Sequence, residues 1–125
     1  MIAADTSSVI NFLLGADTPD RVLVRLALVG EDLCLPPAVK TELLSGTARM
    51  AGLDALLHGA PMLPIRDGYW DRAGDNRRLL KVKGLKANLA DTLIAQSCID
   101  ADVALIARDT DFRHFADWCG LKLAG

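Results

Sequence analysis

Short apolar runs alternate along this chain with longer amphipathic stretches. The apolar runs are typical of buried strands, whereas stretches opened by proline or a capping residue and ended by glycine are typical of helices. The expected strands are Met1–Ala4, Leu33–Leu35, Pro61–Ile65, Val103–Ala107 and Leu121–Leu123. The expected helices run from Ser7 or Ser8 to Leu14, from Pro19 to Gly30, from Pro37 to Gly46, and over 48–58, 69–83, 89–99 and 111–118.

This order of elements predicts a parallel sheet, because strands separated by helices pair in parallel through right-handed crossovers. Such crossovers place helices on both faces of the sheet. We therefore expect an α/β fold, a three-layer α/β/α sandwich with a central parallel sheet of four to five strands. The chain has 125 residues, which suits a single domain over 1–125 and is long enough to bury a core.

Four acidic residues, Asp5, Glu42, Asp91 and Asp109, are expected at one edge of this sheet. Asp5 directly follows the first apolar run and Asp109 follows the fourth, and the carboxyl ends of parallel strands form the functional edge of such folds. Carboxylates about 4 Å apart repel by about 4 kcal/mol per pair at an effective dielectric near 20, so they need a cation or protons. A cluster with only oxygen ligands favours Mg²⁺ or Mn²⁺. The sequence therefore predicts a metal site.

Each acid also has a purely structural interpretation. Asp91 lies three residues after Asn88, which is the spacing of a capping box, and Asp109 or Asp111 is placed to cap the helix that follows. Glu42 on its own resembles an ordinary solvated helix residue. Only the set of four favours a metal site over these alternatives.

Charge is distributed unevenly along the chain. The formal net charge is −2, which does not suggest a nucleic-acid ligand, but the segment Arg66–Lys86 carries seven basic and three acidic residues. Lys81, Lys83 and Lys86, together with Arg108, are therefore candidates for holding a phosphate backbone. The alternative is a solvated helix face.

The cysteines and the apolar segments bear on location and partners. Three scattered cysteines in apolar surroundings indicate buried thiols in a reducing cytosol, and no apolar stretch reaches the length of a membrane span, so we expect a cytoplasmic protein without a membrane partner. The helix expected over Pro19–Gly30 is apolar on nearly all sides. Such a helix, lying on a small sheet, would leave an apolar patch exposed, so we expect it to contact another chain.

Four short motifs follow one another in order: Asp5–Ser7, Val39–Leu43, Ala90–Ala95 and Ala107–Phe112. This ordered set resembles the PIN-domain nucleases, most of all the VapC-type toxins of bacterial toxin–antitoxin pairs. The resemblance implies a PIN-like fold and a metal-dependent endoribonuclease that hydrolyses RNA phosphodiesters with a metal-activated water. It also implies an RNA substrate, a VapB-like antitoxin and a homodimer or larger assembly.

The resemblance also implies roles for individual residues. Asp5, Glu42, Asp91 and Asp109 would hold Mg²⁺ or Mn²⁺, and Thr6 or Ser7 would place a hydroxyl near the ion. Asp111 stands where some relatives carry a further acid, so the choice between Asp109 and Asp111 as the fourth ligand stays open. Two other functions remain as alternatives, a catalytically silent module that binds RNA or protein, and a receiver-like signalling domain.

Overall fold

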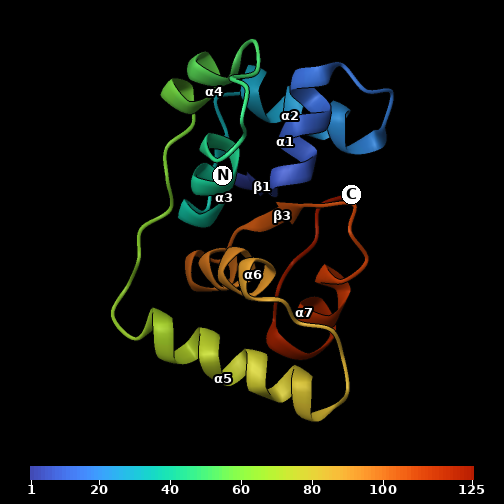
Figure 1. The fold of residues 1–125 in the computed structure, drawn as a ribbon. Coiled ribbons are helices and arrows are strands. Elements are labelled where there is room, and N and C mark those ends of the chain that lie inside the picture. Colours follow the sequence, from blue (N-terminus) through green and yellow to red (C-terminus); the bar gives the residue numbers. More distant parts are fainter.

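A computed structural model describes residues 1–125 and places seven helices around a three-stranded parallel sheet (Figure 1). The strands are β1 (Ile2–Ala4), β2 (Leu33–Cys34) and β3 (Ala104–Ile106), in the order β2-β1-β3. The helices are α1 (Thr6–Leu14), α2 (Pro19–Val29), α3 (Pro37–Leu44), α4 (Leu53–Gly59), α5 (Tyr69–Val82), α6 (Leu89–Ala101) and α7 (Phe112–Cys119). The expected α/β class with a parallel sheet is confirmed.

The sheet carries one parallel bridge beyond each edge strand, where two further strands were expected. Leu35 bridges to Met62 beside β2, and Leu105 of β3 bridges to Leu123. The first pairing is short because the segment lies between Pro61 and Pro64, and proline has no N–H to donate to a ladder. The sheet is thus three regular strands flanked by two single bridges, slightly fewer strands than the four to five expected.

The helices form layers on both faces of the sheet. In Figure 1, α1, α2 and α4 lie on one side of β1 and β3, α6 and α7 lie on the other, and α5 is outermost. A single cluster of 24 buried apolar residues fills the space between the layers, and the residues of β1 in it are the small Ala3 and Ala4. Small side chains in the central strand let the helices on both faces pack closely against the sheet.

Two helix starts differ from expectation. Asp5, rather than Ser7 or Ser8, is the N-cap of α1, because its side chain accepts a hydrogen bond from the Ser8 N–H. Helix α4 begins at Leu53 instead of 48, since Gly52 at its N-cap has φ +83°, a left-handed conformation that no helix residue adopts.

The lengths of the helices and the state of the cysteines can also be described. No helix is long and apolar enough to cross a membrane. The cysteines are all free, and two of them, Cys34 and Cys98, are buried as expected.

Candidate functional site

A hollow of about 270 Å³ lies at the carboxyl ends of β1 and β3. The four predicted acids and the two predicted hydroxyl residues all line it, namely Asp5, Glu42, Asp91, Asp109, Thr6 and Ser7, over an apolar floor of Ile10, Ile94 and Phe112. These acids come from four separate parts of the chain. The parallel pairing of β1 with β3, in which Ala4 faces Ile106, is what brings the ends of those strands together. We refer to this site as the acidic hollow.

Asp5 is the most rigidly held acid of the hollow. Its backbone N–H donates to the Ile106 carbonyl at 3.0 Å, which ties β1 to β3 where both strands end. One carboxylate oxygen accepts from the Ser8 N–H at 2.9 Å and the other from the Ser7 hydroxyl at 3.2 Å. Burial raises the pKa of Asp5, and these hydrogen bonds counteract part of that effect. Asp5 is thus both a helix cap and a wall of the hollow.

Glu42 extends toward the hollow from α3 and is held by α1. The Thr6 hydroxyl donates to its carboxylate at 2.5 Å, across 36 residues of sequence. Glu42 is otherwise exposed, as a solvated helix residue would be. The hydrogen bond with Thr6 fixes the carboxylate at the rim and gives this threonine a positioning role.

Asp91 is both a capping-box residue of α6 and an acid of the hollow, which are the two interpretations that the sequence allowed. Its backbone N–H donates to the Asn88 side chain at 2.8 Å, so Asn88 caps α6 as expected, and the Asn88 amide in turn donates to the Asp91 carboxylate at 3.0 Å. Burial first, and then the nearby charges of Asp109, Asp111 and Asp5, raise the pKa of Asp91 to about 6. The cap therefore orients a carboxylate whose ionisation its surroundings oppose.

Asp109 and Asp111 both lie beside Asp91. The three residues offer oxygen atoms that all lie within 4.8 Å of one another. Asp109 accepts a hydrogen bond from the Asp111 N–H at 2.9 Å, while Asp111, at the start of α7, makes no side-chain capping bond. The carboxylate of Asp111 instead meets the Lys86 ammonium at 3.3 Å. Both acids are therefore placed to complete a cation site with Asp91.

The donors of the acidic hollow suit a hard divalent cation. All of them are carboxylate or hydroxyl oxygens, the kind of ligand that Mg²⁺ and Mn²⁺ take, and no cysteine or histidine lines the hollow. Ionising Asp91 carries an electrostatic cost, first from its burial and then from the crowding of carboxylates without a counter-charge, and together these raise its pKa. A divalent ion held by these oxygens would remove that cost, so the residues present fit such an ion.

The predicted basic residues do not act as one group. Lys83 lies over the Trp118 ring at 3.8 Å from its centroid, and Lys86 pairs with Asp111. Lys81 faces a separate hollow between α5 and α6, and Arg108 is exposed next to Asp109. The three lysines thus lie in three different environments, and their shared role in holding a phosphate backbone stays a prediction.

One residue near the site was not singled out in the sequence. Asp20 of α2 is only 3% exposed and accepts a hydrogen bond from the Asn11 amide at 2.9 Å. Its charge contributes to the raised pKa of Asp5. Following Pro19 in a first helical turn, it resembles an ordinary N-terminal acid, so only its burial distinguishes it.

Several solved structures contain chains of similar fold, and two of these are VapBC complexes. One belongs to the crystal structure of VapBC2 from Rickettsia felis bound to a DNA fragment from their promoter, with a TM-score of 0.78, 19% identity and coverage of 99% of this chain and 98% of that one. The other belongs to DNA-bound VapBC from Salmonella typhimurium, with a TM-score of 0.73, 18% identity and coverage of 99% and 98%. A comparison with curated proteins finds no match.

The family comparison covers nearly the whole chain. The PIN domain family matches residues 2–117, a span that includes every residue of the acidic hollow. This match agrees with the four ordered motifs and with the fold. The chain therefore belongs to the PIN domain family.

Proposed function

We propose that the chain is a metal-dependent endoribonuclease of the cytoplasm and the VapC-type toxin of a toxin–antitoxin pair. The observation that supports this most directly is the convergence of Asp5, Glu42, Asp91 and Asp109 on one hollow in a PIN domain. Four carboxylates from separate elements are not needed to stabilise a fold. They are suited to a divalent ion that meets a phosphodiester. The same convergence and the family leave no support for the receiver-like alternative.

The residues of the hollow would divide the work of hydrolysis. A bound Mg²⁺ or Mn²⁺ would supply charge neutralisation at the phosphate and lower the pKa of an attacking water. Asp91, Asp109 and Asp111 would hold the ion, with Asp5 and Glu42 completing the carboxylate wall. Asn88, Thr6 and the Ser8 N–H keep three of these carboxylates oriented before any substrate arrives.

An exposed face of α2 would contact the partners. Val22, Leu26 and Val29, spaced along one side of the helix, are 53%, 61% and 75% exposed, while Val24 and Ala27 are buried in the core. We propose that this face meets a second copy of the chain or a VapB-like antitoxin, as the VapBC composition of the two similar structures suggests.

The contact can be tested with a pair of variants at one position. Leu26→Glu should keep the fold, since the side chain is exposed, but should lower the sedimenting mass or abolish antitoxin binding because a charge would be buried unpaired. Leu26→Met should preserve both properties. Equal association of the two variants would place the contact elsewhere.

The ribonuclease activity is tested on the intact chain. Purified protein is incubated with a mixed RNA pool with and without Mn²⁺, and the new RNA ends are mapped. Cleavage that requires the ion and is lost in Asp91→Asn supports the proposal. Binding of RNA without cleavage at any metal concentration would instead identify a catalytically silent module.

A further inference from the structure

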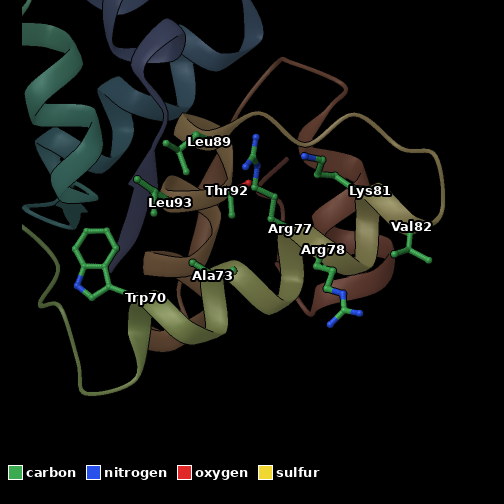
Figure 2. A pocket seen from close by; sticks show the side chains of 10 residues that line it. Trp70, Ala73, Arg77, Arg78, Lys81, Val82, Leu89, Thr92 and Leu93 are labelled. Atoms are coloured by element: carbon green, nitrogen blue, oxygen red, sulfur yellow. The ribbon is translucent and has the colours of Figure 1, made fainter.

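A second, larger hollow of about 730 Å³ lies between α5 and α6 (Figure 2). Its floor is apolar, with Ala73 of α5 facing Leu89 and Leu93 of α6, and Arg78 and Lys81 lie further along α5. Trp70 stands at the opposite end, at the start of α5. We refer to this hollow as the basic groove.

The basic groove is connected to the acidic hollow. A third hollow, of about 420 Å³, shares Trp70, Leu89 and Leu93 with the groove. That same third hollow shares Glu42 with the acidic hollow. The three hollows therefore adjoin one another in order, from Arg78 and Lys81, past Trp70, to the carboxylates.

The cations of the groove have no carboxylate partners. No acidic residue lines the groove, and neither Arg78 nor Lys81 takes part in any of the four ion pairs of the chain. Arg77 is held in place, because its Nε donates to the Ala87 carbonyl at 2.9 Å. In a chain of net charge −2, this uncompensated positive charge beside the site is complementary to a polyanion.

Trp70 is placed as a stacking platform. Its side chain is 64% exposed, and its ring meets the Tyr69 ring edge to face at a centroid distance of 4.8 Å. Tyr69 itself is buried and donates its hydroxyl to the Leu93 carbonyl at 2.7 Å. The exposed indole is thus supported by an anchored neighbour, and aromatic rings of this kind stack on unpaired bases.

We propose that the basic groove holds an unpaired stretch of RNA and leads it to the acidic hollow, with a base stacked on Trp70 and phosphates on Arg78 and Lys81. The inference rests on the proposed ribonuclease function. A duplex would not serve, because its bases are already stacked and paired. A second copy of the chain is a less suitable occupant. If the grooves of two copies faced each other, the cations of one would meet the cations of the other, because no acid lines the groove.

The stacking contact can be followed directly, because the chain has only two tryptophans. Trp118→Phe leaves Trp70 as the only indole. Adding a mixed-sequence single-stranded RNA of about 12 nucleotides without metal should quench its fluorescence. The matched variant Trp70→Phe leaves Trp118, which lies outside the groove, and its emission should change little.

The affinity for RNA should depend on the residues of the groove. Trp70→Leu should weaken binding of the single-stranded RNA about tenfold and leave the weaker binding of duplex RNA nearly unchanged, whereas Trp118→Leu should have no effect. Replacing Arg78 and Lys81 together with Gln should reduce the slope of affinity against salt concentration. The control, Gln at both Arg25 and Arg49, removes the same charge outside the groove and should leave the slope unchanged.

Several outcomes would overturn the proposal: no measurable binding of single-stranded RNA by the parent, parent-like RNA affinity in Trp70→Leu, or a Trp70→Leu variant that changes only the sedimenting mass. The last result would identify a contact between copies. If the parent cleaves RNA with Mn²⁺ while Trp70→Leu binds like the parent, the groove assignment fails and the ribonuclease function stands. If RNA binds as expected but no ion supports cleavage, the groove assignment stands and the ribonuclease function fails.

Discussion

The acidic hollow and the basic groove lie on either side of a third hollow and are built in opposite ways. The hollow gathers carboxylates from four distant parts of the chain, and burial, followed by the charges of the neighbouring carboxylates, raises the pKa of Asp91 to about 6. The groove is formed by two consecutive helices, and its free cations, Arg78 and Lys81, are exposed. Solvated charges cost a fold little, whereas crowded and partly buried ones oppose it. The comparison indicates that the metal-free chain is destabilised locally at the hollow and nowhere along the groove.

The largest expected effect comes from removing one carboxylate of the hollow. Asp91→Asn or Asp5→Asn should lower RNA cleavage by more than about 100-fold, because even the partners of metal ligands contribute about 10- to 100-fold. The metal-free Asp91→Asn variant should melt at or above the temperature of the parent, since the substitution removes like-charge repulsion.

The control for this prediction is Asp117→Asn, which changes an exposed acid of α7 outside the hollow. Cleavage rates and metal-free melting curves of the variants and the parent provide the comparison. Full activity in both hollow variants would contradict the metal site. A strongly lowered metal-free melting temperature would show that the acids serve mainly as helix caps.

The next effect is a pH dependence of stability that belongs to the hollow. The pKa of Asp91 is about 6 in the folded protein and about 3.9 in an unfolded chain, so the folded state keeps a proton that the unfolded state has lost. The free energy of unfolding should therefore fall as pH rises from about 4 to 6, by clearly less than about 3 kcal/mol, because solvent screens the charge of this partly exposed group.

Other carboxylates titrate in the same range, so the measurement is the difference between the parent and Asp91→Asn in urea unfolding at several pH values. The parent should lose stability relative to the variant as pH rises. Saturating Mg²⁺ should reduce that difference, because the ion stabilises the ionised form. A difference that does not vary with pH would contradict the raised pKa of Asp91.

A smaller effect is expected from the hydrogen bond that orients Glu42. Thr6→Val removes the hydroxyl and keeps the shape, and should weaken Mn²⁺ affinity by up to about tenfold, the lower end of the range for residues that position metal ligands. Thr41→Val, an exposed threonine of α3, is the matched control. Calorimetric titration with Mn²⁺ measures both. Equal affinities would show that Glu42 does not reach the ion.

The smallest effects should separate the three lysines that the sequence grouped together. Lys83→Gln should lower the unfolding free energy by about 0.5–1 kcal/mol through loss of the contact with Trp118, without changing RNA affinity. Lys86→Gln should change stability by less than about 1 kcal/mol, because the Lys86 side chain in its pair with Asp111 is 71% exposed, and should slightly tighten metal binding. Only Lys81→Gln should weaken RNA binding. Equal effects of all three substitutions on RNA affinity would indicate that the lysines bind RNA as one group.

The sequence was informative where a local pattern dictates structure. The alternation of apolar runs and helices predicted the parallel sheet, and Asn88 was identified as the cap of α6, which the structure confirms. It was less informative at the edges of the sheet, where Pro61–Ile65 and Leu121–Leu123 form single bridges instead of strands. Pairing at the edge of a sheet depends on which backbone N–H groups the adjacent strand can donate, and a run of apolar residues does not predict this.

The residues of the candidate site were also predictable from the sequence only in part. Asp5 and Asp109 could be selected from the sequence, because each follows an apolar run and parallel strands end at one edge. Glu42 carries no local signal of its own, and only the tertiary fold reveals that Thr6 holds it in the hollow. The burial of Asp20 also appears only in three dimensions.

By itself, the sequence determined the fold class and the positions of Asp5 and Asp109 at the ends of strands, because the periodicity of apolar residues and the ends of strands are local properties of the chain. The tertiary structure decided which charges meet. It placed Asp109 and Asp111 beside Asp91, Lys83 over Trp118 and Lys86 beside Asp111. It also placed between the basic groove and the acidic hollow a third hollow, which shares Trp70 with the groove and Glu42 with the acidic hollow. Long charged side chains select their partners by direction and distance across separate helices, and these are fixed only when the helices have packed.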